Sequence, residues 1–214
     1  MSSAIDICNL ALSQCGDEAT VSAIDPPDGS VQAMHCARFY PIARDVMLQI
    51  GWNFNTRRAA LSLLSEAPTF GWTYAYAWPN DALGVLAVHD AGDSQDLLPQ
   101  PFQTETLSDG SVVLLTDQQS AVCRYTVRID DTAKFPPSFV VGLGHLLESY
   151  LAGPIIKGDS GRKHAQDALK TWRFWLGSAK VADAQSNRIR PDHRPDWIQS
   201  RGFPDGTYTN SWQR

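Results

Sequence analysis

The sequence lacks the features that mark membrane-spanning proteins and disulfide-stabilised secreted domains. It has no uninterrupted run of the roughly 20 apolar residues that a membrane-spanning helix needs, so we expect no membrane partner. Its start, MSSAIDICNLALSQCG, has no basic region ahead of an apolar core, so we expect no signal peptide. None of the cysteines forms a CxxC pair, and they are expected to be buried free thiols in a reducing compartment. They are Cys8, Cys15, Cys36 and Cys123.

Motifs that carry catalysis or hold a cofactor are missing as well. There is no GxSxG, no P-loop and no GxGxxG that follows a strand, so we expect no cofactor. His145 and Glu148 lie three residues apart on a predicted helix, but no third ligand stands at a recognisable spacing, so no metal site is expected. The one enzymatic hypothesis left open is a hydrolase whose site is assembled from scattered residues such as Asp45, His145 and Glu148.

What the chain does contain is enough apolar material for a folded core. It has 214 residues, of which 43% are hydrophobic, and seven of them are Trp. This length suits one large domain, or one domain with an inserted module. The net charge of -5 is unevenly spread, because residues 157–214 hold 11 Lys or Arg against 6 Asp or Glu, whereas residues 1–156 carry a net charge of -10. The basic end predicts contact with an acidic surface or nucleic acid, and the alternative is a solvated end.

Two helices are predicted in the first 50 residues. Ser2 or Ser3 can cap a helix that runs to about Gln14, and Gly16 ends it. A second helix begins near Ser30, and Pro41 is expected either to kink it or to divide it in two. Its expected inward stripe is imperfect and consists of Val31, Met34, Phe39, Ile42, Val46 and Ile50.

The middle of the chain has β character, and helical periodicity then returns. Strands are predicted over residues 58–64, 72–77, 83–89, 100–106, 111–116 and 121–129, with a hairpin turn at residues 108–111. A largely apolar third helix is predicted after Pro137, ending at Gly153 and Pro154. A fourth helix over residues 162–184 has the inward stripe Ala165, Leu169, Trp172, Leu176 and Ala179. Gly142 and Gly144 are expected to allow close helix packing.

The predicted fold class is therefore α+β. We expect a four-helix bundle formed by residues 1–56 and 135–185, an inserted antiparallel β module over residues 57–134, and an extended C-terminal arm over residues 186–214.

The corner between the second helix and the first strand carries a recognisable pattern. Within residues 39–64, Trp52 and Phe54 lie where the apolar period changes from helical to extended, and two such rings are expected to wedge helix against sheet. The pattern Tyr-Pro-x-x-Arg-Asp-x-x-Leu-x-x-x-x-Trp-x-Phe is formed by Tyr40, Pro41, Arg44, Asp45, Leu48, Trp52 and Phe54. It resembles the head-to-tail adaptors of tailed bacteriophages, in particular the tail tubular protein A type of short-tailed phages. The likeness extends to residues 9–16, to Trp78-Pro79 and to the two helices near the C-terminus.

The resemblance implies a structural protein of the virion neck, made in the host cytoplasm, and no enzyme. About twelve copies would form a ring below the portal protein and extend the DNA channel towards the tail nozzle or tail tube protein. DNA would pass through this channel without sequence-specific binding. Two rivals remain open, a DNA-binding or packaging accessory protein, for which Arg57 and Arg58 are candidates, and the unrecognised hydrolase.

The candidate docking site is the C-terminal arm, which is punctuated by proline and shows no helical or strand period. Its aromatic and basic residues are typical of a segment that becomes ordered on a partner, either the portal or a neighbouring subunit. The alternative is that it folds back onto its own helices. The candidate residues are Arg188, Arg190, Arg194, Trp197, Arg201, Phe203, Tyr208 and Trp212.

Overall fold

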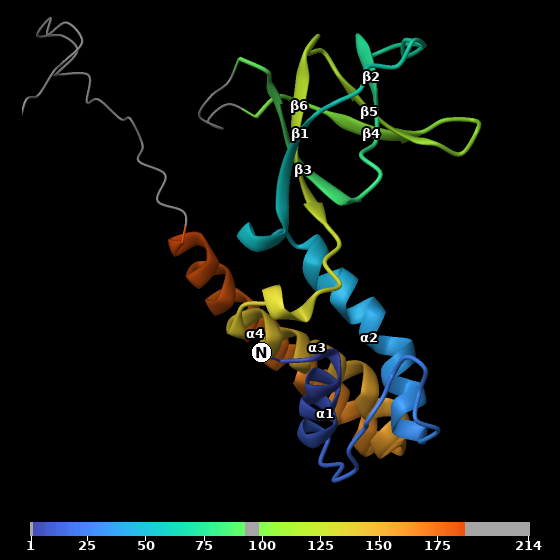
Figure 1. Ribbon diagram of the computed structural model, residues 1–214, viewed down its shortest axis with the longest axis vertical. Helices are drawn as coiled ribbons and strands as arrows, with labels where there is room; N and C mark the ends of the chain where they lie inside the picture. Colours follow the sequence, from blue (N-terminus) through green and yellow to red (C-terminus); the bar gives the residue numbers. More distant parts are fainter. Residues whose placement is uncertain (1, 93–98, 187–214) are drawn as a thin grey trace, which may run out of the picture.

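The fold combines four α-helices with two small antiparallel sheets, so the mixed α+β class predicted from the sequence is correct (Figure 1). The structure is a computed structural model and describes residues 2–92 and 99–186. The helices α1 to α4 form one end of the molecule, and the strands β1 to β6 form the other (Figure 1). The strands fall between α2 and α3 in the chain, so the β part is an insertion into the helical part.

The first helix, α1 (Ala4–Gln14), begins and ends where the sequence indicates. Ser3 is its N-cap, and a reciprocal capping box joins Ser3 to Asp6. The Asp6 N–H donates to Ser3 Oγ at 3.1 Å, and the Ser3 N–H donates to Asp6 Oδ2 at 2.8 Å, so two N–H groups of the first turn are satisfied. Gly16, with a φ of 76°, turns the chain away from the helix.

The second helix, α2 (Val31–Gln49), runs without a break through Pro41. The expectation of two short helices is therefore wrong. Pro41 lies on the exposed side of the helix. Water can therefore reach the carbonyl of Ala37, which loses its usual N–H donor there. The N-cap is Ser30, whose side chain accepts the N–H of Ala33 at 3.1 Å.

The side of α2 that faces the core is predicted only in part, because Phe39, Val46 and Ile50 pack against the core as expected but the other three residues of the stripe do not. Val31, Met34 and Ile42 of the expected stripe are among the exposed large hydrophobic residues. The buried side consists mainly of smaller or amphipathic residues, namely Ala33, Cys36, Tyr40, Ala43, Met47 and Leu48. Small side chains let α2 approach its neighbours closely, and this leaves the larger apolar residues on the outer face of the helix.

The third helix, α3 (Pro137–Ile156), is the centre of the helical part and packs against α1, α2 and α4. By length and composition alone α3 is apolar enough to cross a membrane, but more than half of its most apolar window is buried inside the protein, as in a core helix. Its glycines allow close packing as predicted. A Cβ at Gly142 would lie 3.1 Å from Met47 Cε, and one at Gly144 would lie 3.0 Å from Leu10 Cδ2.

The connection between α3 and α4 (Gly158–Gln185) is shorter than predicted. The helix α3 continues through Pro154 to Ile156, so the expected end at Pro154 is wrong. The chain reverses at Lys157, which has a φ of 60°, and α4 begins at the next residue. The two helices pack closely at Gly161, where the absence of a side chain makes room. A Cβ there would come within 2.9 Å of the Ala152 carbonyl oxygen.

The β part consists of two three-stranded antiparallel sheets. One has the order β1-β6-β3, formed by Thr56–Ala60, Ala121–Val127 and Ala82–Asp90, and the other has the order β2-β5-β4, formed by Tyr74–Ala77, Val112–Thr116 and Gln103–Thr106. All six predicted strands are present, with ends shifted by a few residues. The first ends at Ala60 instead of residue 64, and Leu63 keeps only a single bridge to Tyr76.

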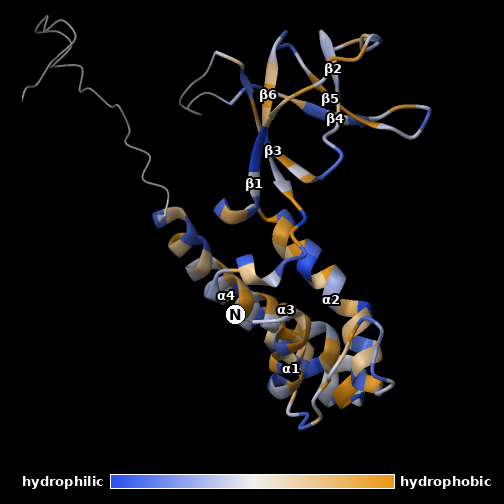
Figure 2. Ribbon diagram, in the orientation of Figure 1, coloured by the Kyte–Doolittle hydropathy of each residue, from blue (hydrophilic) through white to orange (hydrophobic). Residues whose placement is uncertain are grey.

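Local sequence features account for the β4–β5 hairpin turn and for the buried side chains of β6. Gly110, with a φ of 85°, forms the β4–β5 turn, and Asp109 Oδ1 accepts the N–H of Ser111 at 2.9 Å. Along β6 the side chains of Cys123, Tyr125 and Val127 are buried on one face, and Thr126 is buried on the other. Figure 2 shows hydrophobic residues both on the helices and on the strands.

Candidate functional site at the helix–sheet junction

Four residues of the motif, Arg44, Asp45, Trp52 and Phe54, lie where the helical part meets the chain that enters and leaves the first sheet. Gly51, with a φ of 83°, ends α2, and the short 3-10 helix η1 (Asn53–Asn55) leads into β1. A second short 3-10 helix, η2 (Thr132–Lys134), lies on the returning chain before α3. The junction is thus crossed twice, once between α2 and β1 and once between β6 and α3.

Trp52 is the central side chain of this junction, as predicted. It is 1% exposed. Its indole N–H donates to the Met47 carbonyl oxygen at 2.7 Å. The ring meets Phe139 edge-on, with 5.5 Å between the centroids. Phe54 is partly buried and packs edge-on against both Phe135 and Phe139. The two rings therefore pack the corner against α3 and the chain before it, and not against the sheet as expected.

Asn55 is a residue of the junction that the sequence did not reveal. It is fully buried. Its Nδ2 donates to the carbonyl oxygens of Leu48, at 2.8 Å, and of Val127, at 3.2 Å. Its Oδ1 accepts the N–H of Trp52 at 2.9 Å. One amide therefore joins the end of α2, the corner and the end of β6, and it satisfies three backbone groups.

The Arg-Asp pair of the motif forms ion pairs between α2 and the chain after β6. Arg44, which is mostly buried, contacts Asp45 at 3.0 Å and also pairs with Asp130. Asp45 in turn pairs with Arg128. These four charges lie on two chain segments far apart in the sequence, so they help to fix the helical part against the first sheet.

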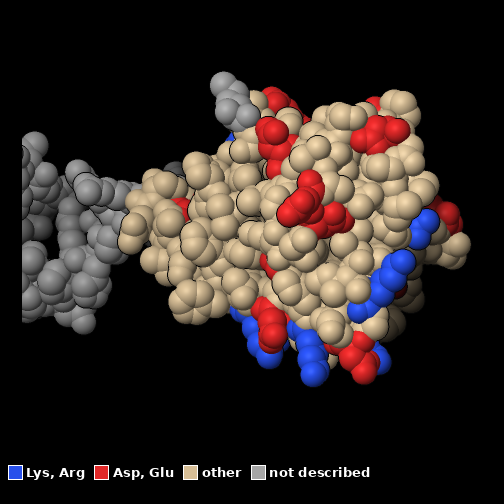
Figure 3. Space-filling view, turned by 90° about the horizontal axis from the view of Figure 1, so that it is seen from below, with Lys and Arg blue, Asp and Glu red and all other residues tan. Residues whose placement is uncertain are grey.

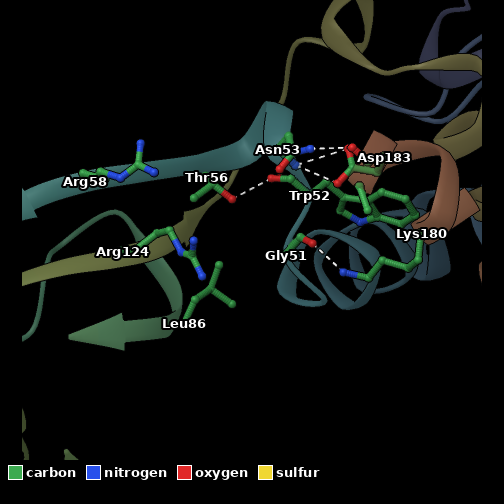
Figure 4. A pocket seen from close by; sticks show the side chains of 10 residues that line it. Gly51, Trp52, Asn53, Thr56, Arg58, Leu86, Arg124, Lys180 and Asp183 are labelled. Carbon is green, nitrogen blue, oxygen red and sulfur yellow. Dashed lines mark hydrogen bonds between the residues drawn. The ribbon is translucent and has the colours of Figure 1, made fainter. Parts of the chain in front are cut away.

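The helix α4 holds the corner from its other side (Figure 4). Lys180 Nζ donates to the carbonyl oxygens of Ile50, at 3.1 Å, and Gly51, at 2.6 Å, and it lies 5.3 Å from the centre of the Trp52 ring. Burial lowers the pKa of this ammonium group. Asp183 accepts the backbone N–H of Asn53 at 3.1 Å, and Asn53 Nδ2 donates to the Asp183 carbonyl oxygen at 2.6 Å.

Beside this contact lies a hollow of about 420 Å³ between β1, β6 and α4. Its lining includes Arg58, Arg124 and Lys180, together with Asp183. Arg58 and Arg124 stand directly opposite each other in the β1–β6 register. The hollow therefore collects positive charge at the junction, and Lys180 directs its ammonium group towards the end of α2 (Figure 4).

The residues of the hydrolase hypothesis are not assembled into one site. Asp45 is paired with Arg44 and Arg128 at the junction. Glu148, which is 7% exposed, instead contacts His145 Nδ1 at 3.0 Å and His164 Nε2 at 2.8 Å. His145 and Glu148 share a helix face as expected, and His164 of α4 is the partner that the sequence did not indicate. Within residues 2–92 and 99–186, no group of three or more His, Cys, Asp or Glu side chains could hold a metal ion.

The other predicted candidates are placed as follows. Arg57 pairs with Asp81 at 2.7 Å, and Arg58 lines the hollow. The four cysteines are buried free thiols, as predicted.

The candidate arm lies outside the described residues, apart from Ser186. Ser186 caps α4, and its Oγ accepts a hydrogen bond from Asn53 Nδ2 at 2.9 Å. The eight arm residues, all outside the described part, are Arg188, Arg190, Arg194, Trp197, Arg201, Phe203, Tyr208 and Trp212.

Comparison with known proteins adds no relative. No family model matches this chain, and no curated protein matches it significantly. The fold is mixed α+β, and the candidate site is an interlocked junction of rings, backbone hydrogen bonds and ion pairs.

Proposed function

We propose that this protein is a structural head-to-tail adaptor of a tailed bacteriophage. Copies of the chain form a ring below the portal protein, extend the DNA channel and provide the platform on which the tail nozzle or tail tube protein assembles. The protein acts in the virion neck through its shape and charge and forms no covalent bond with a substrate.

The observation that supports this proposal most is that four residues of the motif connect the helical part to the β part. Leu48 and Trp52 are buried in the core, and Arg44 and Asp45 bridge α2 to the chain after β6. Each of these side chains packs or pairs within the junction. A motif of this kind keeps two parts of a subunit in a fixed relation, and an adaptor needs that property to hold two different rings in register.

The charge of the chain agrees with a DNA channel. Residues 1–156, which include the whole β part, carry a net charge of -10. A channel wall with negative charge neutralises no phosphates of the DNA, so no counterions are released and the wall does not bind DNA tightly. DNA can therefore slide through an acidic channel without being held.

The proposal is tested by measuring the mass of the purified protein alone and after mixing with the portal of the same phage. We expect the protein alone to be mostly monomeric at micromolar concentration, and light scattering should show a complex of portal and adaptor copies after mixing. A stable ring without the portal would correct the assembly order but leave the adaptor function in place. No complex with the portal would refute the proposal.

The same preparation separates the two rivals. Tight binding of free DNA that weakens steeply with salt would favour the accessory protein, since neutralised phosphates release counterions. Turnover in broad hydrolase screens, lost on changing Glu148 to Gln, would favour an enzyme. The adaptor proposal expects neither result.

A further inference from the structure

The outer side of α2 presents large apolar residues to solvent. Val31, Met34 and Ile42 are 56%, 51% and 52% exposed. Met34 follows Val31 by three residues, and Ile42 follows Met34 by eight, so all three lie along one side of the helix. Arg38 lies between Met34 and Ile42 on the same side. Three exposed apolar chains on one face of a folded helix are typical of a contact surface. We call this set the α2 face.

The outer side of α4 carries a second exposed apolar set. Phe174 is 79% exposed and Val181 is 59% exposed, and they lie seven residues apart on the same line of the helix. Gly177 lies between them, and a Cβ there would meet no atom within 4 Å. The inward residues Trp172 and Leu176 point the other way, into the core. We call this set, formed by Phe174, Gly177 and Val181, the α4 ridge.

Charges of opposite sign precede these two surfaces along the chain. The loop before α2 carries Asp17, Glu18, Asp25 and Asp28 and no Lys or Arg. The part of α4 before Phe174 carries Arg162, Lys163, Lys170 and Arg173. In the view onto the helical end, Lys and Arg lie mainly along the lower and right edges, with some Asp and Glu among them, and other Asp and Glu lie over the middle and the upper edge (Figure 3).

Part of this charge is already paired within the subunit. Arg162 pairs with Asp159, and Lys170 pairs with Asp167 at 2.8 Å. These pairs are exposed, so each is worth little and can be exchanged for a partner across an interface.

We propose that the α4 ridge of one copy docks on the α2 face of the next copy, with the two helices parallel. In this arrangement apolar residues cover apolar residues, and the basic half of α4 lies beside the acidic loop of its neighbour. A contact of either face with itself offers no such charge match. The interface is therefore heterologous, with two different surfaces, and repetition by rotation closes a ring. This inference rests on the proposed ring function and names its subunit contact.

Cross-linking of variants that each carry one added cysteine tests the contact directly. Met34→Cys in one preparation and Phe174→Cys in another place thiols on the two surfaces. The four native thiols are buried, so the reagent reaches them slowly. Burial also raises the pKa of Cys15 to about 12 and that of Cys123 to about 11. Mixing the two variants at high concentration with a short bis-maleimide should give a hetero-cross-linked dimer, because the reagent traps short-lived contacts.

The control is Phe70→Cys, which is 86% exposed in the β part. Mixed with Phe174→Cys it should give several-fold less dimer. Equal yields from the control and the test pair would overturn the inference, and so would a Phe174→Cys dimer that exceeds the mixed product. If residues 187–214 cover the ridge instead, deleting them would speed maleimide labelling of Phe174→Cys several-fold, and that result would also overturn it.

A second variant separates this inference from the proposed function. Phe174→Asp changes an exposed side chain and should leave the fold intact, as circular dichroism would show. Added to the portal, it should lose ring assembly, while the wild type assembles. If the variant assembles as the wild type does, the contact is wrong and the adaptor function stands. If the wild type itself does not bind the portal, the proposed function fails.

Discussion

Asn55 Nδ2 donates to the carbonyl oxygen of Val127 at 3.2 Å, across 72 positions of the chain. This bond links the start of the β insertion to its end, at the point where both leave the helical part. Together with the bonds to Leu48 and Trp52 it makes one buried amide the shared partner of three segments.

Replacing Asn55 by Ala should lower the free energy of unfolding by about 2–3 kcal/mol, because buried backbone groups are left without partners. Urea denaturation monitored by fluorescence measures the change. The matched control is Asn80→Ala at an exposed turn position, which should change the stability by less than about 0.5 kcal/mol. Equal effects of the two substitutions would show that the amide does not join the segments.

Trp52→Ala should cost about 3–5 kcal/mol, since a fully buried ring is removed from between α2 and α3. Thermal unfolding should show a clearly lower midpoint. Phe70→Ala serves as the control for loss of an exposed ring and should leave the midpoint nearly unchanged. A Trp52→Ala variant with the midpoint of the wild type would contradict the role given to the junction.

The loop before α2 should respond to acid through Asp28. Its carboxylate accepts the N–H of Ser22 at 2.8 Å and the N–H of Ser30 at 2.9 Å. Together with the serine hydroxyls these bonds hold the pKa of Asp28 below its usual value of 3.8.

A carboxyl whose pKa is lowered by folding contributes stability above its unfolded pKa and loses it as the pH falls through the folded value. The stability advantage of the wild type over Asp28→Asn should therefore be constant well above pH 3.8 and shrink below it. Denaturation curves measured across this range provide the comparison, with Asp25→Asn as a control in the same loop. An advantage that persists unchanged in acid would contradict this assignment.

Periodicity predicted the elements, because most of them have strong local signals. The N-cap serine at Ser3 and the glycine of the turn at Gly110 both act within a few residues. The buried side of α2 could not be read in this way. Its core face uses Ala33, Cys36 and Ala43, and only the position of α3 decides that small residues belong there.

The junction was predicted in part for the same reason. Trp52 and Phe54 could be recognised because large rings at a change of period have few other roles. Asn55 could not, because its two carbonyl partners are brought together only by the finished fold. Similarly, His164 joins Glu148 across two helices, and no spacing in the sequence relates them.

The candidate arm is tested by deletion. Ser186 caps α4 and contacts Asn53, so the deletion should begin at residue 187 and not at residue 186. Removing residues 187–214 should leave the unfolding midpoint nearly unchanged and abolish binding to the portal, because their aromatic and basic residues are expected to dock there. Calorimetry with the portal measures the binding. Unchanged affinity would show that the arm is not the dock, and a failure to fold would assign it to the subunit's own core.

Electron microscopy of the full-length protein mixed with the portal of the same phage tests the central claim most directly. We expect class averages in which a second ring, with a central channel, stacks coaxially on one end of the portal. We further expect that this ring shares the rotational symmetry of the portal or closes at about twelve copies. Portal particles that remain bare at saturating protein would contradict the assignment of this chain as a head-to-tail adaptor.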